Sequence, residues 1–492
     1  MEFLIISADD NVAVALENLK KNQTVNAGGT AVTLQEEVQR GHKFAIKDIE
    51  QGEKVIKYGF PIGNAYRPIK CGEWVHTHNL KTALEEEATY TFNPKKIEEK
   101  KVKPLTFEGF RRKDGSVAIR NEIWLIPTVG CVNSVAQKLA EYGNKRAGGS
   151  LDGVYAFSHP YGCSQMGDDH QQTGKILADL IKHPNAAGVL VIGLGCENLT
   201  QDQLKDELSQ WDDERVKFLV CQDYEDEFEE GQKLIEQLME YAGSFKRETI
   251  DASELIIGMK CGGSDGLSGI TANPTVGRFS DLIISMGGTT VLTEVPEMFG
   301  AEDILFQRCV DRKTFEKAVS MVDDFKKYYV SHNQVVYENP SPGNKAGGIS
   351  TLEDKSCGCV QKGGTAPVKD VLKYGERVKT KGLNLLSGPG NDLVSATALT
   401  AAGAHMILFT TGRGTPFGAP APTVKISSNS QLKAKKSNWI DFDAGTVAEG
   451  ESIDKAGERL LEYVISVAGG KQTLSEENGF RDIAIFKDGV TL

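Results

Sequence analysis

The run Ala186-Ala-Gly-Val-Leu-Val-Ile-Gly-Leu-Gly-Cys-Glu-Asn198 decides the fold of the middle of the chain. Its apolar part is about half as long as the roughly 20 residues of a membrane span, so it predicts a buried strand. Two similar runs, 122–126 and 153–157, precede it, and each is followed by a Gly-Cys pair and a helical pattern. Strands that alternate with helices predict βα units and therefore a parallel sheet.

The Gly-Cys pairs that follow these three runs are evenly spaced. Cys131, Cys163 and Cys196 lie 32 and 33 residues apart, so successive βα units bring their thiols to the carboxyl edge of one sheet. Helix N-termini at that edge favour thiolate over thiol. The sequence therefore allows an iron–sulfur cluster on these cysteines, with one iron open to substrate. The alternative interpretation is that they are ordinary small buried residues.

The composition is that of a soluble globular protein with several domains. The chain has 492 residues, of which 40% are hydrophobic and 25% charged. Its net charge of −12 argues against nucleic acid or a membrane as partner, because both need a basic surface. Nine widely spaced cysteines and a first segment without a basic region predict a cytoplasmic protein without a signal peptide.

Changes of pattern divide the chain into four parts. Residues 1–92 alternate short β-rich runs with turns and predict a small β domain, with one short helix over 11–20. Residues 93–108 are charged and bounded by prolines, which predicts a linker. The βα pattern predicts an α/β domain over 109–248, and glycine-rich α/β patterning predicts another over 249–492.

Histidines of the β domain are candidate metal ligands. His76 and His78 lie two residues apart on a predicted strand, so both imidazoles point to one face and can chelate a divalent cation. His42 belongs to the same domain and is a candidate for a third nitrogen ligand. The alternative is a pair of exposed strand histidines without such a role.

A loop of the middle domain concentrates groups that transfer protons. It reads Ser158-His-Pro-Tyr-Gly-Cys-Ser-Gln-Met-Gly-Asp-Asp-His170. Burying so many polar groups is unfavourable unless each has a partner or a function. We therefore take His159, Cys163 and His170 as candidate catalytic residues.

Loops rich in glycine and polar residues follow the strands of the last part of the chain. Their backbone amides suit anions, Arg413 offers a bidentate donor to a carboxylate, and Lys345 adds positive charge. Together these loops favour a polyhydroxy or carboxylate ligand, with Ser264, Asp265 and Asn391 as further candidate contacts.

Long strings of residues occur from one end of the chain to the other. The longest reads Cys-Gly-Gly-Ser-Asp-Gly-Leu-Ser-Gly-Ile-Thr-Ala-Asn-Pro at 261–274. The others lie at 40–45, 75–79, 127–133, 159–170, 191–198, 293–300, 338–348 and 412–416. In these strings the chain resembles the altronate and galactarate dehydratase family of sugar-acid hydro-lyases. Cys357 departs from the family pattern, which has cysteine only at the position of Cys359, so Cys357 receives no role.

The resemblance implies a multidomain fold with an N-terminal β-clip domain of the SAF type, followed by α/β domains with parallel sheets. It also implies an Fe(II)-dependent reaction that removes water from D-altronate to give 2-dehydro-3-deoxy-D-gluconate, in hexuronate catabolism. Galactarate and a sulfolactate are the alternative substrates. A non-catalytic sugar-acid binding protein and a nicotinamide dehydrogenase are rivals of other classes, although Gly193-Leu-Gly-Cys-Glu-Asn198 lacks the third glycine of a dinucleotide fingerprint.

Dehydration of an aldonate constrains the residues that perform it. A base must take the C2 proton, a metal or cations must stabilise the enediolate, and an acid must protonate the leaving C3 hydroxyl. We expect His159 and His170 to supply base and acid, in either order, and Arg413 and Lys345 to hold the substrate carboxylate.

Two arrangements of the metal stay open, and ligand softness separates them. One is a mononuclear Fe(II), with Mn(II) as second choice, on His76, His78 and His42; the other is the iron–sulfur cluster on the three Gly-Cys cysteines. Exposed edge strands of the β domain also predict that the chain forms a homo-oligomer, in the simplest case a dimer.

Overall fold

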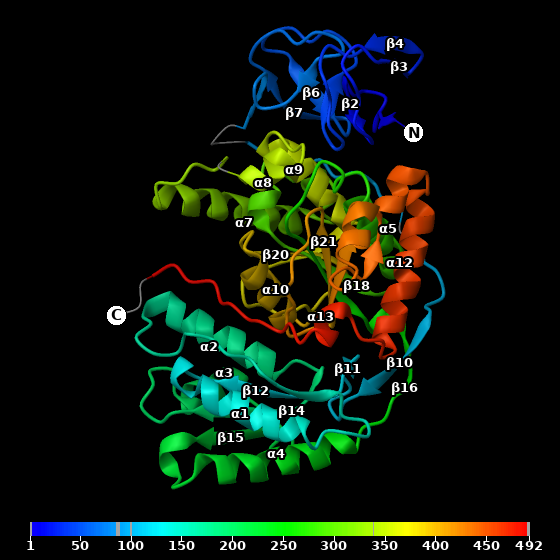
Figure 1. Ribbon diagram of the computed structural model, residues 1–492. Helices are drawn as coiled ribbons and strands as arrows, with labels where there is room; N and C mark the ends of the chain where they lie inside the picture. The colour runs from blue at the N-terminus through cyan, green and yellow to red at the C-terminus, as the bar shows by residue number, and fades with distance from the viewer. Residues whose placement is uncertain (1, 85–88, 99–100, 338, 490–492) are drawn as a thin grey trace.

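The computed structural model describes residues 2–84, 89–98, 101–337 and 339–489. Residues 99 and 100 of the predicted linker and Glu338 of the 338–348 string lie outside these ranges. Figure 1 shows three parts in a stack, with the β domain (blue) at the top, a large α/β unit in the middle and a smaller α/β unit below. The predicted fold class, a small β domain followed by α/β units with parallel sheets, is confirmed.

The N-terminal β domain consists of short antiparallel strands. One sheet has the order β1-β2-β5-β8 and contains β1 (Phe3–Leu4), β2 (Val12–Ala15), β5 (Lys43–Ala45) and β8 (Trp74–Val75). A second sheet contains β6 (Lys54–Lys57), β7 (Phe60–Ala65) and β9 (Leu80–Lys81), and a hairpin pairs β3 (Thr24–Ala27) with β4 (Thr30–Thr33).

The helix predicted over 11–20 is wrong, because Val12–Ala15 forms strand β2. All four residues of β2 are buried. Val12 packs in a cluster with Val75, whereas Ala13 packs in a different cluster with Phe44. A strand that is buried on both faces carries consecutive apolar residues instead of an alternating pattern. Together with Leu16 and Leu19, which follow it, this run places apolar residues three and four positions apart, which is also the pattern of an amphipathic helix.

The smaller α/β unit is built from the repeated strands and helices that the sequence predicts. Its four parallel strands have the order β13-β12-β14-β15 and are β12 (Glu122–Pro127), β13 (Gly153–Ala156), β14 (Ala186–Gly193) and β15 (Val216–Val220). Helices α1 (Asn133–Asn144), α2 (Gly167–Ile181), α3 (Gln201–Leu208) and α4 (Glu227–Gly243) alternate with them. Every residue of β14 is buried, as expected for a central strand with a helix layer on each face.

The large α/β unit has a seven-stranded parallel sheet in the order β19-β20-β18-β17-β21-β22-β23. The strands are β17 (Ile256–Cys261), β18 (Thr289–Leu292), β19 (Val368–Leu372), β20 (Gly382–Leu386), β21 (Met406–Thr411), β22 (Thr423–Ser427) and β23 (Phe442–Asp443). The helices are α5 (Ala272–Ser285), α6 (Glu302–Phe306), α7 (Arg312–Ser331), α8 (Pro342–Ala346), α9 (Leu352–Cys359), α10 (Asp392–Ala401), α11 (Ser430–Lys435), α12 (Ile453–Ala468) and α13 (Leu474–Glu477).

Two apolar layers hold the large sheet between its helices. On one face, Ile257 and Met259 of β17 pack with Phe279 of α5 and Leu460 of α12. On the other face, residues of β18 and β21 pack against α10. Figure 1 shows α5 and α12 side by side, away from α10. Strand β17 lies between β18 and β21, which lead to opposite halves of the sheet. The loops that follow these strands therefore diverge at the carboxyl edge beside β17. Ligand sites of open α/β sheets commonly lie at such a point.

An antiparallel sheet and the C-terminal segment join the two α/β units. The sheet has the order β11-β10-β16 and contains β10 (Thr106–Arg111), β11 (Val117–Ala118) and β16 (Glu248–Asp251). The predicted boundaries at 108 and 248 both fall inside its strands. After α13 the chain (red in Figure 1) returns along the smaller unit, where the Ile485 N–H donates to the Tyr161 hydroxyl.

None of the helices in the described part of the chain combines the length and the apolar character that crossing a membrane requires.

Candidate active site

Four strands of the large sheet deliver polar loops to its carboxyl edge. β17 ends at Cys261, and residues 293–297 follow β18. Residues 387–391 follow β20 and lead into α10, and the loop with Arg413 follows β21. Between β18 and β20 in the chain, α9 ends at Cys359 near the same edge. We call the polar residues that meet there the thiol–lysine cluster: Lys260, Cys261, Glu294, Glu297, Lys355, Cys359, Lys362 and Asp392. Asp392 is partly exposed, and the others are buried.

Two thiols and a carboxylate lie at the centre of the thiol–lysine cluster. The Sγ atoms of Cys261 and Cys359 are 3.5 Å apart. Both thiols donate to Oε2 of Glu297, at 3.0 Å and 3.1 Å. All three side chains are buried, although 98 residues of sequence separate the two cysteines.

Three ammonium groups surround this centre. Lys355 Nζ lies 2.7 Å from Glu297 Oε1, and Lys362 Nζ lies 3.3 Å from Glu294 Oε2. Lys260 Nζ is 3.3 Å from Glu294 Oε1 and 2.6 Å from Asp392 Oδ1. The three lysine side chains are at most 8% exposed, so each needs its carboxylate partner.

The two buried glutamates have opposite pKa shifts. Burial raises the pKa of Glu294 and outweighs the attraction of Lys260 and Lys362. Burial also acts on Glu297, but there Lys355 and Lys362 outweigh it and lower the pKa to about 2. Two carboxyl groups whose environments separate their pKa values are a common basis for dividing acid and base roles.

Glu294 also has an unusual backbone. Its φ of 71° and ψ of 60° are in the left-handed region, which a side chain with a Cβ rarely adopts. The Cys261 N–H donates to Glu294 Oε2 at 2.8 Å, which ties this strained residue to the end of β17. Strain of this kind persists where the surroundings enforce it, and it is typical of functional sites.

The β domain is anchored to the helix that carries part of the thiol–lysine cluster. Asp354 of α9 accepts from Lys43 Nζ at 2.8 Å and from Lys57 Nζ at 3.0 Å, and all three side chains are buried. Burial would raise the pKa of Asp354, but the two lysines hold it well below its usual range. Because Lys355 is the next residue, docking of the β domain fixes the position of a lysine of the cluster.

The candidate substrate-binding residues are brought to this edge of the sheet. Arg413 is exposed and donates to Gly343 O at 3.0 Å, which places it over the start of α8. Lys345 lies on the same short helix. The side chain of Asn391 caps α10, and Asp265 accepts hydrogen bonds from Ser268, Ser428 and Asn429, so both already have structural partners. The buried Ser264 hydroxyl has no partner within the described residues.

Two of the candidate metal-binding histidines face the same region, but each already has partners. His42 Nδ1 accepts from Trp74 Nε1 at 3.2 Å, and His42 Nε2 lies 3.4 Å from Ala346 O. His76 Nε2 donates to Lys345 O at 2.9 Å. Burial lowers the pKa of His76 to about 4. His78 packs against the ring of Trp74, and among the described residues it does not form a ligand group with His42 and His76. His42, His76 and His78 therefore do not converge on one point.

The three Gly-Cys cysteines lie at the carboxyl edge of the other sheet. Cys131, Cys163 and Cys196 are all exposed. Across the ranges that the structure describes, their sulfur atoms do not form a group within 4.8 Å. The predicted common edge is present, but the separation of the thiols does not suit a cluster.

The candidate acid and base, His159 and His170, belong to this smaller unit as well. His159 Nε2 donates to Pro127 O at 2.7 Å, and its Nδ1 accepts from the Tyr161 N–H at 3.1 Å. Burial lowers the pKa of His159 to about 4, so its imidazole is neutral and its two hydrogen bonds stabilise the loop that begins at Ser158. His170 lies on α2, where its Nε2 is 3.3 Å from Gln203 Oε1. Neither histidine contacts the thiol–lysine cluster.

Sequence reasoning assigned no role to most of the thiol–lysine cluster. Glu294 and Glu297 and the Cys357-Gly-Cys359 sequence are recognisable as polar loop segments. Nothing local indicates that Cys359 meets Cys261. Two features of the sequence could have indicated part of the site. Cys261 lies at the end of a predicted strand, and the loop Glu294-Val-Pro-Glu297 follows the next predicted strand.

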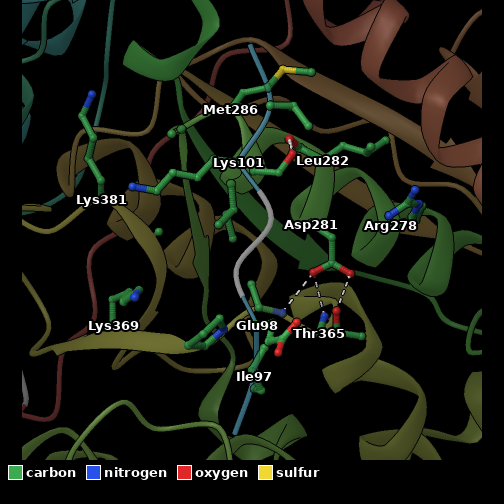
Figure 2. Close-up of a pocket in the computed structure, with 18 residues that line it drawn as sticks. Ile97, Glu98, Lys101, Arg278, Asp281, Leu282, Met286, Thr365, Lys369 and Lys381 are labelled. Atoms are coloured by element: carbon green, nitrogen blue, oxygen red, sulfur yellow. Dashed lines mark hydrogen bonds between the residues drawn. The ribbon is translucent and has the colours of Figure 1, made fainter. Parts of the chain in front are cut away.

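A separate cavity of about 570 Å³ lies between the linker and α5. Its lining includes Ile97 and Lys101 of the linker and Asp281 and Leu282 of α5 (Figure 2). Asp281 already accepts from the backbone and hydroxyl of Thr365. Among the described residues that line the cavity, none belongs to the thiol–lysine cluster.

The fold and the site together define the class of the protein. A charged, desolvated reaction centre at the carboxyl edge of a parallel sheet, next to the point where the strand order reverses, is that of an α/β enzyme.

Comparison with known proteins gives the family. Three family models match in succession: the altronate/galactarate dehydratase SAF domain at 1–83, the second domain of D-galactarate dehydratase/altronate hydrolase at 109–243, and the C-terminal D-galactarate/altronate dehydratase domain at 252–491. The chain belongs to the galactarate/altronate dehydratase family, and the resemblance seen in the sequence is confirmed.

Three full-length relatives agree with this assignment. The chain is 53% identical to an altronate dehydratase of Escherichia coli over 100% of both chains. It is 52% identical to an altronate dehydratase of Bacillus subtilis over 100% of this chain and 99% of that one. Identity to a galactarate dehydratase of Escherichia coli is 33% over 98% of this chain and 96% of that one.

Proposed function

We propose that the protein removes water from D-altronate to give 2-dehydro-3-deoxy-D-gluconate, and that the thiol–lysine cluster is its reaction centre. The identity of 53% and 52% to two altronate dehydratases, against 33% to a galactarate dehydratase, supports altronate as the substrate. The observation that carries the placement is the gathering of three buried lysines and two glutamates with opposite pKa shifts.

The positive charge of the thiol–lysine cluster suits the intermediate of this reaction. Removing the C2 proton of an aldonate produces an enediolate that carries two negative charges. Lys260, Lys355 and Lys362 supply fixed cations for it in a desolvated place, where such groups stabilise charge far more than they do in water. Arg413 and Lys345 lie at the rim, where they can meet the carboxylate of the incoming substrate.

The carboxyl groups supply the proton transfers. Glu294, whose pKa is raised by burial, is the candidate acid for the proton that the leaving C3 hydroxyl requires. Asp392 is the candidate base for the C2 proton, because its side chain is 28% exposed and lies 2.6 Å from Lys260 Nζ. These assignments replace the proposal of His159 and His170, whose contacts hold them in the smaller unit.

The family resemblance implies Fe(II), with Mn(II) as second choice. When bound, such an ion would polarise the substrate carboxylate and stabilise the enediolate. Neither of the donor sets expected from the sequence fits it. The nitrogens of His42 and His76 already have partners, and the three Gly-Cys thiols stand apart.

The test is turnover of sugar acids by the purified, iron-loaded chain under anaerobic conditions. We expect a 2-keto acid from D-altronate, with galactarate and sulfolactate at least tenfold slower in kcat/KM. Turnover of galactarate or sulfolactate alone would overturn altronate as substrate. Saturable binding of altronate without product would favour a binding protein, and a change in absorbance that requires added NAD would favour a dehydrogenase.

We also propose that the protein acts in the cytoplasm, in hexuronate catabolism, as a homo-oligomer. All nine cysteines are free, which suits a reducing compartment. The sugar acid is the expected partner, and the net charge of −12 disfavours nucleic acid or a membrane. Light scattering at micromolar concentration tests the oligomer, and a monomer would contradict it.

A further inference from the structure

Two groups of candidate metal ligands have their atoms within 4.8 Å of one another in the described ranges of the chain. One consists of Glu36, Glu73 and His78 and is half-buried; there Glu73 is already paired with Arg67. The other consists of Cys261, Glu297 and Cys359 and is buried. Its mixture of two thiols and a carboxylate is a ligand set for a transition metal.

The spacing of the ligand atoms in the buried group is close to that around one ion. Cys261 and Cys359 Sγ are 3.5 Å apart, and both are within 3.1 Å of Glu297 Oε2. Ligands at about 2.0 to 2.3 Å from a tetrahedral ion are roughly 3.3 to 3.8 Å from each other. Shifts of a few tenths of an ångström would therefore accommodate the ion without rearrangement of the backbone.

The surroundings already orient these ligands. Cys261 is the last residue of β17, Glu297 lies in the turn after β18, and Cys359 ends α9. The second oxygen of Glu297 accepts from Lys355 Nζ at 2.7 Å, so Oε2 remains directed at the thiols. Groups that hold a ligand through its other atom are a regular feature of metal sites.

The charge of the thiol–lysine cluster also suits a divalent ion. Its three lysines lie 2.6 to 3.3 Å from three carboxyl groups, those of Glu294, Glu297 and Asp392. Binding of a divalent ion would convert two S–H groups to thiolates and release two protons to solvent. The ion and the two thiolates together carry no net charge, so binding leaves the net charge of the cluster unchanged and adds no uncompensated buried charge.

There is space for one more ligand beside Cys359. A cavity of about 10 Å³ is lined by Cys359, Lys355 and Ser264, among other residues. This is about the room that one water molecule requires. The Ser264 hydroxyl, in a residue only 2% exposed, has no partner within the described part of the chain. A metal site that keeps a position open to water or substrate is typical of catalysis.

We propose that Cys261, Glu297 and Cys359 bind one divalent transition-metal ion through two thiolates and a carboxylate, with a fourth position toward the Ser264 cavity. This inference deepens the proposed function, because it places the metal inside the reaction centre, but its test does not depend on turnover. Thiolate ligands favour iron, cobalt or zinc over Mg(II), Ca(II) or Mn(II).

The experiment is anaerobic titration of the reduced, metal-free, full-length chain with Co(II), followed by absorption spectroscopy. We expect one equivalent of bound Co(II) and an intense thiolate-to-cobalt charge-transfer band in the near ultraviolet. Cys261→Ser and Cys359→Ser should each reduce this band by about half and weaken binding at least tenfold. These losses are expected because each variant removes one of the two thiolate ligands.

Cys357→Ala is the matched control, because Cys357 is equally buried and lies two residues from Cys359 on α9, outside the ligand group. It should keep the band and the affinity. A parent chain that binds Co(II) without the band would overturn the proposal even if the variants failed to fold. So would an unchanged band in folded Cys261→Ser or Cys359→Ser protein.

Turnover of altronate separates this inference from the proposed function. The full cobalt spectrum in an iron-loaded chain that does not act on altronate would overturn the function and support the metal site. Turnover of altronate by a chain without the charge-transfer band would overturn the site and support the function.

Discussion

The two parallel sheets of this protein differ in what covers their carboxyl edges. Both edges carry cysteines. In the smaller unit Cys131, Cys163 and Cys196 are exposed, whereas in the large unit Cys261 and Cys359 are buried. The large edge is covered by α8 and α9, and the β domain rests on these helices (Figure 1). A strand order that places thiols at an edge is therefore not sufficient for a reaction centre.

Burial changes the chemistry that polar groups at these edges can perform. At the large edge, burial raises the pKa of Glu294, whereas Lys355 and Lys362 outweigh burial at Glu297 and lower its pKa. At the small edge, Glu197 is buried too, but its carboxylate accepts from neutral donors, Thr128 Oγ1 and the N–H groups of Leu194 and Gly195.

The largest effect is expected from Glu294→Gln. The amide cannot balance Lys260 and Lys362 or carry the proton for the leaving hydroxyl, so kcat for altronate should fall about 1,000-fold, or about 4 kcal/mol. Formation of the 2-keto acid measures this change. The matched variant Glu197→Gln follows a strand of the other sheet and should keep kcat within about twofold. Equal losses in the two variants would contradict the assignment of the reaction centre.

Asp354→Asn tests whether the covering β domain is held by its buried ion pairs. The change leaves Lys43 and Lys57 without a counter-charge, which for a broken buried pair costs about 3 to 5 kcal/mol. We expect a lower thermal midpoint and faster proteolysis in the linker at 93–98. Asp48→Asn removes an exposed pair with Lys70 in the same domain and should change neither. A stable, resistant Asp354→Asn chain would show that other contacts hold the domain.

The buried histidine of the smaller unit should make stability depend on pH. The pKa of His159 is about 4 in the folded chain, against an ordinary value of 6.5, because burial disfavours its charged form. The unfolded chain therefore takes up a proton first, and stability falls as pH drops from 6.5 toward 4. This group accounts for about 2 kcal/mol at pH 5.

The variant His159→Gln isolates that contribution. Its thermal midpoint should fall less between pH 7 and pH 5 than that of the parent chain, because glutamine has no proton to take up in this range. Identical pH dependence in the two chains would show that His159 is not the group responsible.

The smallest effect is expected from replacing Cys131, Cys163 and Cys196 together by serine. Their exposed, separated thiols do not form a ligand group, so iron bound per chain should be unchanged and acid-labile sulfide absent from both proteins. A parent chain with as much acid-labile sulfide as iron, and a triple variant without it, would support the iron–sulfur cluster. The metal site would then lie at the edge of the smaller sheet.

Much of the fold was predictable because it depends on local pattern. The run at 186–193 is a fully buried strand, and the βα alternation predicts the order of elements in the smaller unit. The helix predicted over 11–20 is wrong because that local pattern is ambiguous there. The residues of β2 are buried on both faces by partners far away in the chain, and no local pattern shows which partners these are.

The sequence by itself determined the βα architecture, the family and the loops that carry polar groups, because strand and helix periodicity and long strings are properties of neighbouring residues. Tertiary structure alone decided which loops meet. Cys261 and Cys359 come together because β17 and α9 end at one edge, and the β domain anchors α9 through Asp354. Burial and charge pairing, which turn these residues into a reaction centre, depend on contacts between segments about 100 to 300 residues apart.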